Sequence, residues 1–151
     1  MTRVQRANRG LPNPDYRSEM YRDVAAKRLL AWVIDVVLIV IMVAVLSIFS
    51  LGIAFLIMPI LYGTVSFLYR WSTLSAGSAT LGMRFMAIEV RRADGDTLDG
   101  TTAFWHTFGY FISFIITPLQ VISVAMMAGT PRNQGLTDMV LGTVVMNKQM
   151  S

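Results

Sequence analysis

Apolar residues along this chain fall into long blocks that polar residues hardly interrupt. Residues 29–49 form the first block, which as an α-helix would be about 31 Å long and would cross a bilayer's hydrocarbon core once. Residues 50–52 are the only weak point before the second block, residues 53–69. Because the break is so short, the two blocks are predicted to form an antiparallel pair of transmembrane helices, the second one kinked at Pro59.

A third apolar region, residues 101–130, allows two arrangements. One continuous helix would be about 45 Å long, which is more than a bilayer core requires. Thr117-Pro118 divides the region near its middle, and a residue before proline is biased away from helical conformation. Residues 103–129 are therefore expected to form either one kinked span or two shorter helices that fold back and return Arg132 to the starting side.

Short-period alternation appears between the second and third blocks, in residues 70–100. Apolar side chains occupy alternate positions at residues 86–90, and the Asp-Gly pair that follows is a hairpin-type turn signal. We predict a short strand and a turn here, with a second strand after the turn left open. The apolar run at residues 142–146 is too short to cross a membrane and is predicted to pair with residues 86–90. Gly77 and Gly82 are expected to allow turns and close packing.

The chain's composition agrees with membrane insertion. Of its 151 residues, 54% are apolar and 15% are charged, whereas about a quarter of the residues of a soluble domain are charged. Asp35 is the only charged residue between positions 29 and 69. The expected fold is a mainly α-helical membrane protein with a transmembrane helical hairpin, a third Pro-broken apolar helix or helix pair, and a short cytoplasmic β element.

The distribution of positive charges predicts how the chain is oriented in the membrane. Eleven of the 13 Lys and Arg residues lie in residues 1–28 or 70–92, and the turn between the first two blocks has none. The positive-inside rule therefore places the amino terminus and residues 70–100 in the cytoplasm. We expect residues 1–24 to be a cytoplasmic basic tail and residues 25–151 to be a single membrane domain.

Few residues carry catalytic chemistry. The chain has no cysteine, which excludes disulfides and thiolate sites, and it shows no paired acids, nucleophile–base set or metal-ligand spacing. An enzyme, a cofactor and a metal site are therefore not expected. His106 lies among aromatic residues, where an interfacial histidine is favoured over a proton shuttle. Nucleic-acid binding is not expected either, because the basic residues flank apolar spans.

Three stretches resemble one known family. They are "KRLLAWVID", "GSATLGMRFMAIEVRRADG" and "QGLTDMVLGTVV". In this order, over about residues 25–147, they resemble the RDD family of small membrane proteins, named for an arginine and two aspartates. Those residues correspond here to Arg28, Asp35 and Asp138. The supporting motif residues are Gly77, Leu81, Gly82, Arg84, Gln134, Gly142 and Thr143.

The resemblance implies a multi-pass membrane protein. We expect it in the plasma (inner) membrane of a bacterium, with the amino terminus in the cytoplasm and, if residues 103–129 fold back, the carboxyl terminus there too. Transport, including cation/proton exchange, has been proposed for some relatives. The chain also departs from the family pattern. Met83 and Met139 stand where members commonly have a base, and Ala87 replaces a usual glycine, so two positive charges are missing beside the motifs.

A carboxylate inside an apolar helix is costly, so Asp35 should face protein or a water pocket rather than lipid. Arg28 lies on the same side of the helix but leans towards its start. The expected partners of Asp35 are an arginine of residues 70–100, backbone donors near residues 135–138, or a proton of its own. We predict a polar cluster of Arg28, Asp35 and Asp138, with a capping role at a turn as the alternative for Asp138.

Asp35 therefore has two candidate roles. It is either a hydrogen-bonded clamp on the first span or a carboxylate that exchanges protons or cations, because removal from water favours its protonated form. The whole chain likewise has two candidate functions, a transport-related role and that of an accessory or assembly subunit of a larger membrane complex. The expected partners are the lipid bilayer, further copies of the chain or other membrane proteins, and, for transport, a small cation and protons.

Overall fold

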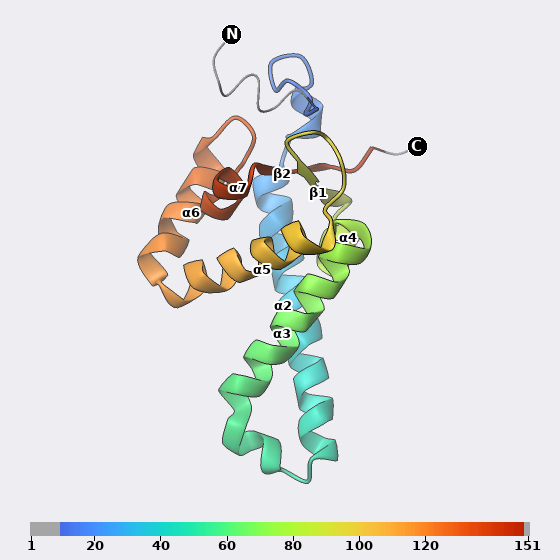
Figure 1. The fold of residues 1–151 in the computed structure, drawn as a ribbon, viewed down its shortest axis with the longest axis vertical. Coiled ribbons are helices and arrows are strands. Elements are labelled where there is room, and N and C mark those ends of the chain that lie inside the picture. Colours follow the sequence, from blue (N-terminus) through green and yellow to red (C-terminus); the bar gives the residue numbers. More distant parts are fainter. Residues whose placement is uncertain (1–9, 150–151) are drawn as a thin grey trace.

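The computed structural model describes residues 10–149, which are mainly helical (Figure 1). Residues 1–9 of the predicted basic tail lie outside the described residues. The elements in chain order, with η for a 3₁₀ helix, are η1 (Ser18–Met20), α2 (Val24–Phe49), η2 (Ile53–Ile57), α3 (Met58–Gly77), α4 (Leu81–Phe85), β1 (Ile88–Arg92), α5 (Gly100–Ile115), α6 (Thr117–Gly129), α7 (Leu136–Leu141) and β2 (Thr143–Asn147).

Helices α2 and α3 form the predicted antiparallel hairpin (Figure 1). With the short turns before them, they are the two described helices that are long and apolar enough to cross a membrane. Gly52 lies between them with φ +88°, a left-handed conformation that glycine adopts without steric cost. Pro59 lies in the first turn of α3, where its missing N–H is not needed. The predicted kink at Pro59 is therefore wrong.

Helix α3 continues to Gly77, eight residues past the end of the apolar block at Tyr69. The sequence predicts a span that ends at residue 69, but the Ser- and Thr-containing residues that follow stay helical. The hydroxyls of Ser72, Thr73 and Ser75 each donate to a backbone carbonyl one turn earlier, at 2.6–2.7 Å. These bonds satisfy the polar side chains inside the helix, so polarity alone did not mark its end.

Helices α5 and α6 meet at a bend of 116°. Ile116 has non-helical backbone angles, and Pro118 lies in the first turn of α6. The pair lies beside the hairpin and carries α7 and β2 back to the end of the molecule where α2 begins (Figure 1). The structure therefore has two shorter helices with a sharp bend between them, in place of one continuous helix.

Strands β1 and β2 pair antiparallel, with Val90 opposite Val145. The predicted pairing between residues 86–90 and 142–146 is therefore confirmed, with each strand starting slightly later than expected. The second strand left open directly after the Asp-Gly turn does not form, since residues 93–99 contain no strand. Instead, Arg92 forms ion pairs with Asp94, Asp96 and Asp99, at 3.0, 3.6 and 3.3 Å, which close residues 93–99 into a loop.

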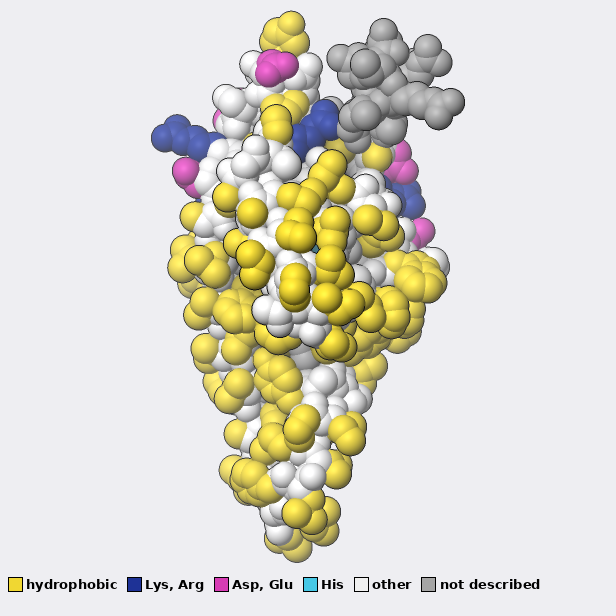
Figure 2. Space-filling view, turned by 90° about the vertical axis from the view of Figure 1, so that its left-hand side faces the viewer, with side chains coloured by type: hydrophobic (Ala, Val, Ile, Leu, Met, Phe, Trp, Pro, Cys, Tyr) yellow, Lys and Arg dark blue, Asp and Glu magenta, His cyan; other side chains and the backbone are white. Residues whose placement is uncertain are grey.

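A small core joins the sheet to the start of the hairpin. Val24, Ile88 and Val145 are buried in one cluster, and Leu11 and Tyr21 pack with β2 residues in another. The described part of the predicted tail is thus packed against the sheet. The far half of the hairpin instead exposes large apolar side chains, and on the face seen in Figure 2 the charged side chains gather at the opposite end. This distribution suits a membrane-type protein.

Candidate functional site

Asp35 is buried in α2, with 1% of its surface exposed. Its carboxylate accepts hydrogen bonds from the Tyr69 and Thr80 hydroxyls, both at 2.6 Å, and from the Gly82 backbone N–H at 2.9 Å. The Arg70 guanidinium approaches it only to 3.8 Å. Asp35 therefore faces protein, as predicted, and both of its oxygens have donors.

The start of α4 supplies two of these donors. Thr80 is the N-cap residue, so its hydroxyl oxygen accepts the Met83 N–H while its hydroxyl hydrogen goes to Asp35. Gly82 lies in the first turn, where backbone N–H groups have no partner within the helix. A Cβ at Gly82 would overlap the carbonyl oxygen of Ala31. The close-packing role predicted for Gly82 is therefore confirmed.

Asp138 is the second buried carboxylate, also with 1% exposure. The Arg28 guanidinium donates to it at 2.6 Å, and the His106 ring nitrogen Nε2 lies 2.9 Å away. The Gly135 N–H at 3.0 Å and the Thr143 hydroxyl at 3.2 Å complete its donors. Asp138 is thus an ion-pair partner of Arg28 and, through the Gly135 N–H, a cap of α7, the capping role given as its alternative.

The charge state of Asp138 follows from these neighbours. Burial by itself raises the pKa of a carboxyl, but the Arg28 guanidinium, the His106 side chain and the Gly135 N–H outweigh it, and the pKa of Asp138 lies well below its ordinary value. An ionised Asp138 can only accept hydrogen bonds, so His106 carries its proton on Nε2. The His106 side chain is 14% exposed, and its Nε2 lies against Asp138.

The predicted polar cluster therefore forms as two separate groups. Arg28 pairs with Asp138, while Asp35 takes its donors from α3 and α4. The backbone donors expected for Asp35 near residues 135–138 serve Asp138 instead. The arginine expected from residues 70–100 is Arg70, at a distance beyond a hydrogen bond.

One cavity of about 470 Å³ lies where the hairpin meets α5, α6 and α7. Arg28, Asp35 and Asp138 all line it, so both groups open onto the same space. Further polar residues on its wall include Arg70, His106, Thr107, Tyr110, Ser113 and Gln120. Within residues 10–149, the acidic and histidine side chains form no group of three that could hold a metal ion.

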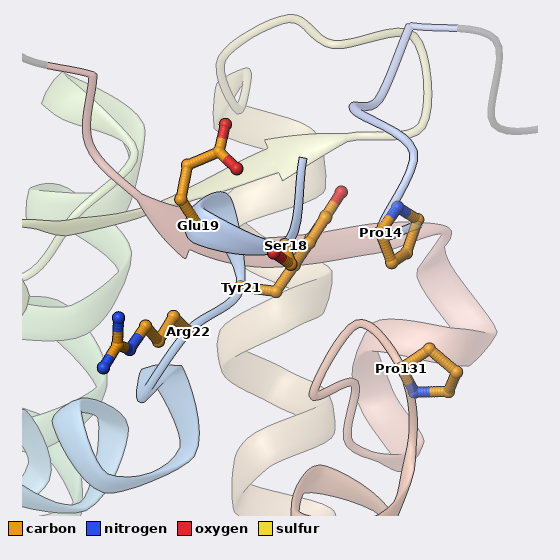
Figure 3. A pocket seen from close by; sticks show the side chains of 6 residues that line it. All are labelled: Pro14, Ser18, Glu19, Tyr21, Arg22 and Pro131. Atoms are coloured by element: carbon orange, nitrogen blue, oxygen red, sulfur yellow. The ribbon is translucent and has the colours of Figure 1, made fainter. Parts of the chain in front are cut away.

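A second pocket of about 340 Å³ lies near the start of the described chain (Figure 3). Pro14 and Pro131 contribute to its lining together with Ser18, Glu19, Tyr21 and Arg22. The charged ends of Glu19 and Arg22 point in different directions in Figure 3. Because its charged groups do not converge, this pocket is the weaker candidate for a site.

Comparison with known proteins identifies the family. Residues 24–142 match the RDD family. The chain belongs to the RDD family. Neither the curated proteins nor the solved structures gave a match. The three residues that the sequence resemblance matches to the family's name-giving arginine and aspartates are the two buried carboxylates and the arginine that pairs with one of them.

The other RDD motif residues support this geometry. A Cβ at Gly77 would meet the Arg84 guanidinium, whose Nε donates to the Ala79 carbonyl. The Leu81 N–H donates to the Tyr69 hydroxyl, which orients that hydroxyl towards Asp35. The Gln134 side-chain amide donates to the Thr143 carbonyl, and Gly142 ends α7 with φ +64°.

The departures from the RDD pattern lie in three different surroundings. Met83 lines the cavity, so the base usual there would have faced the interior. Met139 is exposed, so the missing charge there is a surface charge. Ala87 has φ +54°, in the left-handed region where glycine is favoured. The glycine usual in the family therefore has a backbone reason that Ala87 does not meet.

The roles of three site residues, Tyr69, Thr80 and His106, were not predicted from the sequence. Tyr69 stands at the end of an apolar block, where it was counted with the block, yet its position directly before Arg70 marked the polar end of that helix. Thr80 precedes a short helix and could have been recognised as an N-cap. His106 is the only histidine of the chain, and its uniqueness was the available signal.

Proposed function

We propose that this RDD protein has a transport-related role and that the cavity of about 470 Å³ is where it binds a small solute. The observation that carries the proposal is the convergence of Arg28, Asp35, Arg70, His106 and Asp138 on one cavity beside two apolar helices. Ionisable residues within membrane segments are rare because they are costly, and they commonly mark substrate or ion pathways. No catalytic step is part of this proposal.

In this proposal Asp35 acts as a clamp rather than as the exchanging group. Its three hydrogen bonds tie α2 to the end of α3 and the start of α4. Releasing the carboxylate for a proton or a cation would leave buried donors without an acceptor. The pair of Arg28 and Asp138 fastens α7 to α2 in the same way, so the two groups keep the cavity walls in place.

The proposed role requires more than one copy or a partner. Two long helices and one folded-back pair scarcely enclose a pathway on their own. The solute would therefore cross at a contact between copies, and we propose a homo-oligomer in the plasma membrane of a bacterium with both termini in the cytoplasm.

The test uses the full chain in vesicles that contain a pH-sensitive dye. Cation/proton exchange and the movement of a weak acid both change the internal pH, so gradients of Na⁺, K⁺ or an organic acid can be imposed in turn. We expect at least one gradient to give a pH change that Ser113→Phe slows about tenfold, because this buried side chain lines the cavity. Ile115→Phe, on the exposed side of the same helix, is the matched control.

Asp35→Asn separates the two roles of the carboxylate. The clamp predicts a less stable protein that still gives the pH change when inserted, whereas loss of the pH change in normally folded protein would make Asp35 the exchanging group. If no gradient produces a pH change that depends on the cavity, the transport-related role is wrong.

An accessory or assembly subunit is the second candidate. It is favoured by the large apolar side chains exposed along the far half of the hairpin, such as Phe49, Leu51 and Leu56, which can pack on other membrane helices. Purification in mild detergent distinguishes the two. A stoichiometric complex with unrelated subunits supports the accessory role, and a homo-oligomer active in vesicles supports transport.

A further inference from the structure

Arg70 is an arginine whose hydrogen-bonding capacity is left open at the cavity wall. Its side chain is 11% exposed, its guanidinium reaches Asp35 only at 3.8 Å, and its Nε is buried without a partner among the described residues. Its guanidinium carbon lies 4.4 Å from the centre of the Tyr110 ring, which orients the group without accepting a hydrogen bond in the plane of the guanidinium. Buried arginines normally have acceptors, because an unpaired charged donor is costly.

Thr107 supplies a second, independent open donor on the same cavity. It is 1% exposed, and its hydroxyl has no hydrogen-bond partner among residues 10–149. A threonine within a helix can bond to a carbonyl of the preceding turn, but this one does not. Two residues that line one cavity, from the different helices α3 and α5, thus each have a buried polar atom without a hydrogen-bond partner among the described residues.

The acidic residues of the cavity do not supply these acceptors. Asp35 already accepts from two hydroxyls and a backbone N–H, and Asp138 from a guanidinium, a histidine and two further donors. The Arg70 guanidinium can only donate and carries a permanent positive charge, and the Thr107 hydroxyl can donate as well. A ligand that completes them must bring acceptor oxygens, and a negative charge matches Arg70 best.

The rest of the wall is apolar. Trp32, Leu74, Phe114, Val124 and Met127 line the cavity, and its volume of about 470 Å³ falls in the range of sites for small organic ligands. A free inorganic anion would leave this apolar surface uncovered, whereas a chain attached to the anion would cover it.

We propose that the cavity binds an anionic amphiphile, with its carboxylate or phosphate on Arg70 and Thr107 and its apolar chain along the α5–α6 side of the cavity. Arg70 donates through the fork of its guanidinium, and Thr107 donates its hydroxyl hydrogen. This inference rests on the proposed function in that it names the chemical class of the solute bound in the cavity.

The experiment measures quenching of Trp32 in the full chain, purified in uncharged detergent micelles. The chain has three tryptophans, so Trp71→Phe and Trp105→Phe leave Trp32, on the cavity wall, as the only fluorophore. The probe is bromododecanoate. Bromododecanol and a brominated dodecyltrimethylammonium serve as neutral and cationic counterparts, and inorganic phosphate serves as a competitor. A matched protein that keeps only Trp105, which is 50% exposed, reports general partition into the micelle.

We expect saturable quenching of Trp32 by bromododecanoate, at a concentration about tenfold lower than for the neutral and cationic probes. Arg70→Gln should weaken it about tenfold, and Thr107→Val several-fold. Arg22→Gln, at an exposed arginine, should leave the quenching of Trp32 by bromododecanoate unchanged. Because the Thr107 hydroxyl has no partner among the described residues, Thr107→Val should fold at least as well as the parent, which keeps the test valid if Arg70→Gln is unstable.

Equal quenching by all three head groups, or quenching unaffected by both Arg70→Gln and Thr107→Val, would overturn the proposal. Full competition by inorganic phosphate would show a free-anion site and would also contradict it. Quenching by vesicles of brominated phosphatidylglycerol, rather than by the single-chain acid, would identify the amphiphile as a lipid of the bilayer. Binding of the amphiphile without a pH change in vesicles would contradict the transport-related role and leave this binding site standing. A cavity-dependent pH change without binding of the amphiphile would support the transport-related role and contradict this site.

Discussion

The two buried carboxylates of this RDD protein are stabilised in different ways. Asp35, within a candidate membrane span, relies on two neutral hydroxyls and a backbone N–H, with its nearest arginine at 3.8 Å. Asp138, on a short helix next to the sheet, has an arginine at 2.6 Å and a histidine at 2.9 Å. Both are 1% exposed, so burial alone does not decide which kind of partner a carboxylate takes.

The difference follows from what each neighbouring segment can offer. An arginine at the start of α2 can reach Asp138 because the folded-back pair brings α7 to that end of the helix. Asp35 lies about two turns further along, where the first turn of α4 presents its free N–H groups. The stability of buried Asp138 should therefore depend on the opposite charge of Arg28. The stability of buried Asp35 should depend on the exact position of the start of α4.

The largest expected effect is at Arg28. Arg28→Met leaves the Asp138 charge buried without its main counter-charge, which should lower the free energy of unfolding by about 3–5 kcal/mol. Arg70→Met should lower it by only about 1 kcal/mol, because Asp35 keeps its three neutral donors. Chemical unfolding in detergent micelles measures both. Equal losses in the free energy of unfolding for Arg28→Met and Arg70→Met would contradict the view that Asp138 relies on an arginine and Asp35 does not.

The next effect is at the helix end that meets Asp35. Gly82→Ala places a methyl group against the Ala31 carbonyl and the Asp35 carboxylate, and should lower the free energy of unfolding by about 1–3 kcal/mol. Gly63→Ala is the matched control, since a Cβ there meets nothing within 4 Å. Its unfolding free energy should stay the same or rise by up to about 1 kcal/mol. Similar values for the two variants would argue against close packing at Gly82.

Acidic pH should act through Asp138. Its folded-state pKa is lowered, chiefly because Arg28 and His106 outweigh burial, so its contribution to stability is fully present above the unfolded value of about 3.9 and is lost as pH falls further. Thermal unfolding in micelles between neutral pH and pH of about 3 should show the first part of this loss. Asp138→Asn should lose less stability over the same interval, and an unchanged profile in that variant would contradict this origin.

The smallest expected effect is at Ala87, which joins α4 to β1. Its φ of +54° costs an L-residue about 1–2 kcal/mol, and the flexibility of glycine in the unfolded chain offsets part of this. Ala87→Gly should therefore raise the free energy of unfolding by about 0.5 kcal/mol. Melting of the parent and the variant side by side detects this, and a lower melting temperature for the variant would count against strain at Ala87.

The hairpin and the sheet could be predicted from the sequence because each depends on a local pattern. Two apolar blocks with a three-residue break leave little choice but an antiparallel pair, and alternation at residues 86–90 matched the run at residues 142–146. The end of α3 could not be read in the same way, because Ser72, Thr73 and Ser75 are polar but are satisfied within the helix.

The site was only partly predictable. The sequence indicated that Asp35 needs donors and that Asp138 could meet Arg28, since both follow from the cost of a buried charge. Which donors reach Asp35 depends on how α2, α3 and α4 are rotated about their axes, and a single sequence does not contain that information. Thr117-Pro118 likewise indicated that the helix breaks, but not the direction in which α6 continues, because packing between α5 and the rest of the fold sets the bend.

A pair of double-mutant cycles tests most directly whether the RDD residues form two independent groups. The variants are Arg28→Met, Asp35→Asn and Asp138→Asn, with unfolding free energies measured in micelles. Arg28 and Asp138 should couple by about 2 kcal/mol or more, as residues of one hydrogen-bonded pair do, whereas Arg28 and Asp35 should add within about 0.5 kcal/mol. Strong coupling between Arg28 and Asp35, or additivity between Arg28 and Asp138, would contradict the account.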